Sequence, residues 1–182
     1  MRILGIDPGS INCGYGFVIA AEAHSRVRAG AGTQQIVYGG SGRIVMSAAK
    51  ALEVRLSELF RSLREVIEES APDVIAVERI FFAKSTKSAL TLGHTRGVIL
   101  LAIAESGRPL AEYSALEVKK AVVGYGRAEK AQVESMVRRL LDIRHNLSPD
   151  SSDALALALC HAHQTSFAAS GKRHAMRSRK PS

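Results

Sequence analysis

The sequence contains only two cysteines, Cys13 and Cys160, which lie far apart and form no CxxC pair. This spacing argues against a disulfide framework and against a zinc ribbon. The N-terminal residues MRILGID lack the apolar core of a signal peptide. The most apolar run, residues 97–104, is much shorter than the roughly 20 residues that span a bilayer. We therefore expect a cytoplasmic protein with no membrane segment.

Acidic residues are missing from the C-terminal segment 166–182, which carries five Lys or Arg residues. The formal net charge of +8 falls to +3 when these five are removed, so the rest of the chain is only mildly basic. The hydrophobic content of 46% is sufficient for a core. We predict one domain over residues 1–165 and a basic, disordered tail over 166–182.

A second stretch without acids lies between Arg79 and Ala104. Its basic residues are Arg79, Lys84, Lys87 and Arg96. A local cluster of positive charge is more informative about a nucleic-acid partner than the net charge of the whole chain.

The hydrophobic pattern predicts strands first and then alternating helices and strands. The expected strands are 2–7, 15–21, 34–40, 73–80 and 109–114, and the expected helices are 46–69, 88–105, 116–123, 129–142 and 150–164. The first three strands would form an antiparallel meander. This order favours an α/β fold with a five-stranded mixed sheet flanked by helices.

Four acids occupy unusual positions in this pattern. Asp7 ends the first strand, Glu78 lies inside the apolar strand VIAVERIFF, and Asp150 and Asp153 begin an apolar helix three residues apart. Asp7 alone could be a turn residue before Pro-Gly, and the two aspartates alone suit helix capping. Glu78 is harder to explain, because a glutamate is rarely buried without a partner.

A shared cation would explain all four acids together. Neighbouring first and fourth strands would bring Asp7 and Glu78 together, and the last helix would add Asp150 and Asp153 on one face. Ligand sets made only of oxygen atoms suit Mg²⁺ or Mn²⁺. Two such ions roughly 4 Å apart can bind the attacking water and the leaving oxygen of a phosphodiester.

Five sequence blocks resemble the Holliday-junction resolvases of the RuvC type, over residues 1–163. The blocks are ILGIDPGS…GYG, AVERIFFAK, SALTLGHTRGV, VKKAVVGYGRAEKAQV and DSSDALALALCHAH. The resemblance implies a ribonuclease-H-like fold, a homodimer and cleavage of four-way DNA junctions in recombination and repair. It also implies two Mg²⁺ ions per active site, replaceable by Mn²⁺, and the branch-migration complex RuvA-RuvB as a partner.

By position in these blocks, Asp7, Glu78, Asp150 and Asp153 match the family's metal-binding acids. Lys119 and Lys130 match its two basic residues near the cleaved phosphate, and Phe81 resembles its base-contacting aromatic residue. Arg79 stands where many members have glutamine. The DNA-contacting residues that we expect are Phe81, Arg79, Lys84, Lys87, Lys119, Lys120, Arg127 and Lys130.

Three other functions remain possible from the sequence. Sugar kinases and actin-like ATPases also begin with GIDxG, but they have two lobes, which 182 residues do not accommodate. A non-catalytic DNA-binding module would use the acids only structurally. A different nuclease of the same fold would act on RNA–DNA hybrids. Nuclease assays on junctions, duplexes and hybrids separate these alternatives.

Overall fold

The computed structural model describes residues 1–21, 35–79 and 86–177 of the chain. In these ranges, five strands form one sheet in the order β3-β2-β1-β4-β5. They are β1 (Arg2–Asp7), β2 (Asn12–Ala21), β3 (Gln35–Val45), β4 (Val74–Glu78) and β5 (Leu110–Tyr113). The first three strands pair antiparallel, whereas β4 is parallel to both β1 and β5. The predicted five-stranded mixed sheet and its meander are confirmed.

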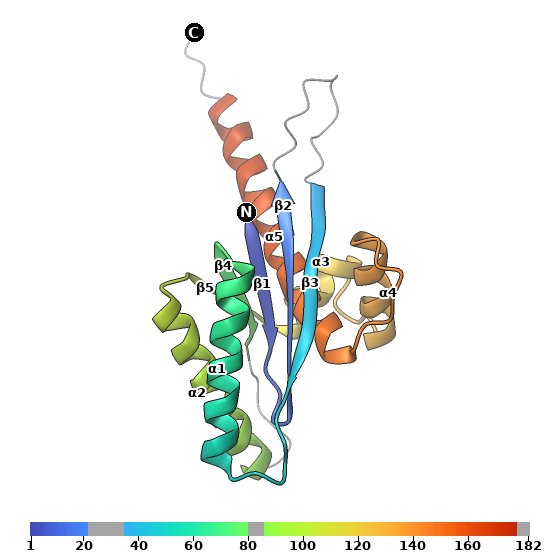
Figure 1. Cartoon of the computed structure of the whole chain (residues 1–182). Coiled ribbons are helices and arrows are strands. Elements are labelled where there is room, and N and C mark those ends of the chain that lie inside the picture. The colour runs from blue at the N-terminus through green and yellow to red at the C-terminus, as the bar shows by residue number, and fades with distance from the viewer. Residues whose placement is uncertain (22–34, 80–85, 178–182) are drawn as a thin grey trace.

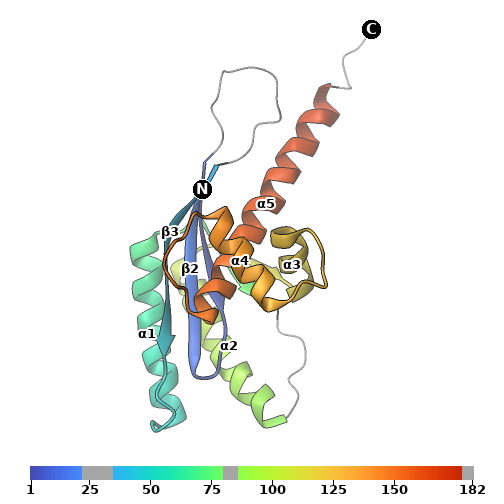
Figure 2. The same cartoon turned by 90° about the vertical axis from the view of Figure 1, so that its right-hand side faces the viewer.

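Within the described residues, five helices cover the two faces of this sheet (Figures 1 and 2). They are α1 (Leu52–Ser70), α2 (Thr86–Ser106), α3 (Ala115–Val123), α4 (Lys130–Leu140) and α5 (Pro149–Arg177). The helices α1 and α2 pack together on one face, and α3, α4 and α5 cover the other. In the described parts of the chain, no helix combines the length and apolar character that crossing a membrane requires.

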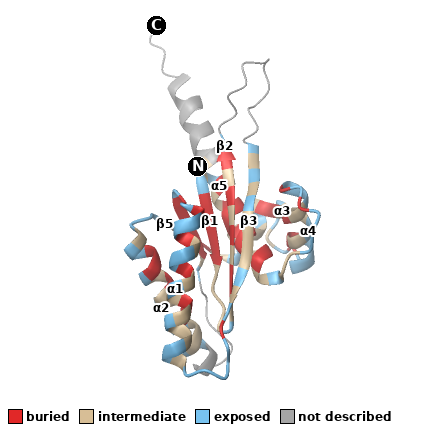
Figure 3. Cartoon of the chain, in the orientation of Figure 1, coloured by how far each residue is buried: buried red, intermediate tan, exposed pale blue. Residues whose placement is uncertain are grey.

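The sheet lies between two hydrophobic cores because alternate strand residues face opposite sides. In β1, Ile3 packs in the core beneath α5, whereas Leu4 and Ile6 pack in the core beneath α1 and α2. In β4, Ala76 faces α5 and Val77 faces the other helices. Figure 3 shows most of β1 in red and an alternation of red and tan along β2.

Helix α5 crosses β1 and β2 at unusually short range because glycines line its path. A Cβ atom at Gly5 would lie 1.9 Å from the backbone carbonyl oxygen of Ala154. A Cβ atom at Gly14 would lie 2.1 Å from the carbonyl oxygen of Asp150. Any side chain at either position would therefore push the first turns of α5 away from the strand ends.

Two helix boundaries differ from the sequence expectation. Helix α1 begins at Leu52 rather than near Met46, because β3 continues to Val45 and the Met46 amide donates to the Ile11 carbonyl (2.7 Å). Helix α5 continues to Arg177 instead of ending near 164, so that part of the expected disordered tail is helical. A helix already anchored by packing propagates readily through an Ala-, Lys- and Arg-containing segment. The division into a domain over 1–165 and a separate tail stays a prediction.

Candidate active site

Asp7 and Glu78 end two adjacent parallel strands at the same edge of the sheet. The register pairs Ile6 with Val77, so the next residue on each strand is one of these two acids. Strand alternation turns Asp7 to the side of Ile3, and Glu78 to the side of Ala76, which is the α5 side in both cases. The prediction that the first and fourth strands are neighbours is confirmed.

The N-terminal part of α5 brings its two aspartates to this edge. Asp153 lines a pocket of about 240 Å³ together with Asp7 and Glu78. Its other lining residues are Ala115, Val118, Lys119, Lys130, Val133, Ala156 and Leu157. Asp150 does not line this pocket, although its charge acts on Asp7. The two aspartates therefore face the strand acids unequally, which their spacing alone did not indicate.

Two lysines complete the pocket from α3 and α4. A capping box fixes the start of α3, since the Ser114 amide donates to Glu117 Oε2 (2.8 Å) and the Glu117 amide donates to Ser114 Oγ (3.3 Å). This places Lys119 along the pocket wall. Lys130 is the first residue of α4, and its Nζ donates to Asp153 Oδ2 at 2.5 Å.

Burial and neighbouring carboxylates raise the pKa of two acids in this pocket. Burial, followed by the charges of Asp153, Glu78 and Asp150, raises the pKa of Asp7 to about 7, against a small opposing effect of Lys130. Burial and then Asp153 raise the pKa of Glu78. The hydrogen bond to Asp153 raises the pKa of Lys130. The pocket thus holds more negative charge than its nearest lysine balances.

The acids suit a divalent cation in donor type and charge, although they do not form a closed cage. Over the described residues, no group of three or more His, Cys, Asp or Glu side chains is arranged to hold a metal ion. Mutual repulsion between carboxylates and the contact of Lys130 with Asp153 are physical reasons for this spacing. Oxygen donors and excess negative charge fit a hard cation such as Mg²⁺. The role of the four acids as metal ligands stays a prediction.

Of the other expected DNA-contacting residues, three are exposed and two lie outside the described residues. Arg79, Lys120 and Arg127 are exposed, and Arg79 Nη2 donates to the Glu112 carbonyl oxygen at 3.2 Å. Lys87 lies in the first turn of α2. Phe81 and Lys84 lie outside the described residues.

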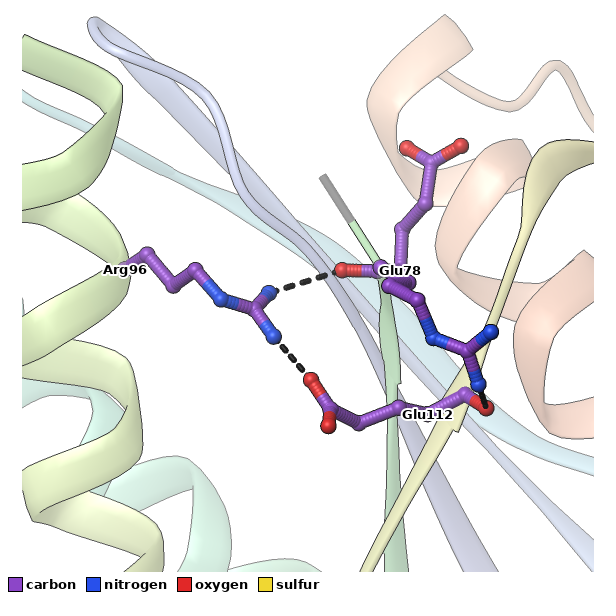
Figure 4. A network of polar contacts seen from close by, with 4 residues as sticks. Glu78, Arg96 and Glu112 are labelled. Atoms are coloured by element: carbon purple, nitrogen blue, oxygen red, sulfur yellow. Dashed lines mark hydrogen bonds and ion pairs between the residues drawn. The ribbon is translucent and has the colours of Figure 1, made fainter. Parts of the chain in front are cut away.

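One polar contact at the end of β4 was missed by sequence reasoning. Arg96 of α2 donates through Nη1 to the Glu78 carbonyl oxygen (2.8 Å) and pairs through Nη2 with the Glu112 carboxylate (Figure 4). The sequence placed Arg96 in a basic segment and gave no role to Glu112. A charged residue within the apolar run of α2 and an acid within a short strand were the available signals.

The chain matches the family described as crossover junction endodeoxyribonuclease RuvC over residues 3–161. The RuvC protein of Koribacter versatilis is 48% identical over 164 residues, which cover 90% of this chain and 93% of that protein.

Solved structures agree with this match. The Thermus thermophilus RuvC structure has a TM-score of 0.79 at 30% identity, covering 92% of this chain and 97% of that one. The structure of the same protein with a Holliday junction substrate has a TM-score of 0.78 at 27% identity, covering 92% and 96%. The ribonuclease-H-like fold class is thereby confirmed. Sequence match, fold and strand-end acids agree, and the chain belongs to the RuvC family of crossover junction endodeoxyribonucleases.

Proposed function

We propose that this chain is a metal-dependent endonuclease that resolves four-way DNA junctions by hydrolysing one phosphodiester in each of two like strands. The observation that carries the proposal is the pocket in which Asp7, Glu78 and Asp153 meet Lys119 and Lys130. Acidic and basic side chains around one pocket suit a phosphodiester, which needs charge stabilisation on both its nucleophile and its phosphate.

The four acids would hold the metal, with Asp7 and Glu78 on rigid strand ends and Asp150 and Asp153 on α5. When bound, a pair of Mg²⁺ ions supplies activation of water and stabilisation of the leaving oxygen, and Mn²⁺ would replace Mg²⁺. Burial and the neighbouring carboxylates raise the pKa of Asp7, so a bound cation would favour its charged form. The strand ends fix two of the carboxylates before the substrate arrives.

The lysines would act on the phosphate rather than on the metal. Lys119 lines the pocket from α3, and Lys130 neutralises Asp153 at its rim. Arg79, Lys120 and Arg127 are exposed and would bind the DNA backbone farther along the strand, as Lys84 and Lys87 would from the basic segment. Phe81 would contact bases near the junction centre. The contacts to the DNA backbone would position the strand without reading its sequence.

A four-way junction presents two equivalent strands, so two identical active sites are required. We propose a homodimer formed through the outward face of α2. On this face Leu90 and Leu101 are 63% and 52% exposed. A Cβ atom at Gly93 or Gly97, between them, would meet no described atom within 4 Å. Sedimentation of Leu101→Glu would give a monomer, whereas an unchanged dimer would contradict this face. The branch-migration complex RuvA-RuvB and the cytoplasmic location stay predictions.

Cleavage of synthetic junctions tests the proposed function. The protein should cut a four-way junction at symmetric positions with Mg²⁺ and leave it intact with EDTA. Linear duplex and RNA–DNA hybrid of the same sequence serve as matched substrates. Preferential cutting of the hybrid would indicate the other nuclease class, and junction binding without any cutting would indicate a binding module. ATP turnover without nuclease activity would overturn the proposed function and indicate the ATPase class instead.

A further inference from the structure

The carboxyl end of β4 is held by β5 on one side, where Glu78 pairs with Tyr113, and by a side chain where its pairing with β1 stops. Pairing of β4 with β1 ends at Ile6 and Val77, one residue before Glu78. The Glu78 carbonyl oxygen accepts a hydrogen bond from Arg96 Nη1 at 2.8 Å. This bond links β4 to α2 across 18 positions of sequence. Together with the pairing to β5, it fixes the backbone of the strand at the residue that carries the acid.

The guanidinium of Arg96 is itself fixed by a second partner. Its other terminal nitrogen, Nη2, pairs with Glu112 Oε1 on the adjacent strand β5. The Arg96 side chain is only 19% exposed, so solvent weakens this pair less than a surface pair. A guanidinium is planar and donates in fixed directions, so two partners determine its position. Glu112 thereby sets where Arg96 can bind Glu78.

The contact uses the backbone of Glu78 and leaves its carboxylate free. In Figure 4 the carboxylate of Glu78 points away from Arg96 and toward α5, while the carbonyl oxygen points toward Arg96. The carboxylate lines the pocket that contains Asp7 and Asp153. Arg96 can thus locate the acid without forming an ion pair that would compete with a cation.

We propose that Arg96, held by Glu112, is a positioning residue for Glu78 that sets how the Glu78 carboxylate meets Asp7 and Asp153. This inference rests on the proposed metal-dependent nuclease function, because it assigns a role within the same pocket. Partners that orient metal-binding side chains typically change metal affinity or activity 10- to 100-fold when removed.

The test compares Arg96→Gln and Glu112→Gln with Arg64→Gln. Arg64 pairs with Glu68 on the exposed surface of α1 and serves as the matched control. Mn²⁺ affinity is measured without DNA by electron paramagnetic resonance, and single-turnover junction cleavage is measured across a Mg²⁺ titration. Thermal unfolding and junction affinity in EDTA are measured in parallel.

We expect Arg96→Gln to weaken Mn²⁺ binding by about 10- to 100-fold and to shift the Mg²⁺ dependence of cleavage equally. Glu112→Gln should do the same to a smaller extent, and Arg64→Gln should match the wild type. Junction affinity in EDTA should stay unchanged in all three. Arg96→Lys, which retains the charge with a single donor group, should lie between wild type and Arg96→Gln, and it replaces Arg96→Gln if that variant is unfolded.

Two results would overturn the inference. Wild-type Mn²⁺ affinity in folded Arg96→Gln or Arg96→Lys would show that Glu78 does not depend on Arg96. A parallel loss of thermal stability, junction affinity and Mn²⁺ affinity would show a general structural role. Failure of the proposed function is distinguishable, since the wild-type protein would then leave junctions uncut with Mg²⁺, whatever the variants do to Mn²⁺ binding.

Discussion

The two faces of the sheet serve the same pocket in different ways. On the α5 face, side chains supply the chemistry, because Asp7, Glu78 and Asp153 all point into the pocket. On the α1 and α2 face, arginines bind backbone instead, since Arg55 donates to the Ser10 carbonyl oxygen and Arg96 donates to that of Glu78. One face carries the acids, and the other fixes the chain that carries them.

This division explains why the residue types on the two faces differ. Glycines on β1 and β2 allow the backbone of α5 to approach, so that short aspartates reach the strand ends. The opposite face packs large side chains such as Leu59, Leu63 and Ile99 against the sheet. A close helix brings its aspartates to the ends of the strands, whereas a thick apolar layer gives a rigid support.

Asp7→Asn makes the largest expected change and tests the role of the α5 face. The amide keeps the size of the side chain but removes the charge that a cation requires, so junction cleavage should fall to the background of the assay. Junction binding in EDTA should survive, because Asp7 donates nothing to the phosphate backbone. Asp142→Asn is the matched control, since Asp142 is exposed on the surface. Cleavage by Asp7→Asn at a near wild-type rate would rule out the metal-site assignment.

Gly5→Ala tests whether the close approach of α5 is required. The added Cβ would lie 1.9 Å from the Ala154 carbonyl oxygen, so the helix must move. Overpacking of this kind costs about 1–3 kcal/mol of unfolding free energy, and cleavage should drop with it because Asp153 moves away from Asp7. Urea denaturation and single-turnover cleavage measure the two effects.

Gly126→Ala is the control for the cost in stability. Its Cβ would first meet Leu116 Cδ1, the end of a side chain that is 52% exposed and free to rotate. We expect a change in unfolding free energy of less than about 0.5 kcal/mol. Equal destabilisation by the two substitutions would contradict the importance of the α5 approach.

The sequence predicted the α5 face better than the other face, for a physical reason. Carboxylates at strand ends and at a helix start are locally anomalous, and Glu78 in an apolar strand could be recognised without any partner. Arg96 and Glu112 are each ordinary in their own segments. Their meaning comes from a contact between α2 and β5, which local periodicity does not encode. The same limit applies to Asp150, whose position relative to the pocket depends on the packing of α5.

In the metal-free protein, the raised pKa of Asp7 on the α5 face should make the stability of the fold depend on pH. The pKa of Asp7 is about 7 in the folded chain and near 3.8 in the unfolded chain, so the folded state retains a proton that the unfolded state has lost. Stability from this group is therefore full below pH 3.8 and is lost as the pH rises through about 7.

In EDTA we expect the melting temperature of the wild type to fall between about pH 4 and pH 7 and to level off above this range, and that of Asp7→Asn to fall less. Added Mg²⁺ should reduce the fall in the wild type, because a cation favours the charged carboxylates. Differential scanning fluorimetry across this range measures the difference. Parallel melting curves against pH for the two proteins would show that ionisation of Asp7 has little effect on the stability of the fold.

The smallest expected change comes from the far end of α5, where the comparison is between two parts of one helix. Most residues of α5 from Ser151 to Ala162 are buried, whereas Lys172, Arg173 and Arg177 lie at the other end of the helix. At 1.5 Å per residue, Thr165 is already about 18 Å along the helix from Asp153. Charges beyond it are too far away to act on the cleaved phosphate.

A chain ending at Thr165 should therefore cut at the wild-type rate when junction DNA is saturating, and bind more weakly below saturation. Each lost phosphate contact should make the dependence of log affinity on log salt shallower by about 0.9. Replacing the five Lys and Arg residues of 166–182 by Gln in the full chain should give the same slope, which separates charge from helix length. Loss of cleavage at saturating DNA would mean that the tail contributes to the reaction itself and not only to binding.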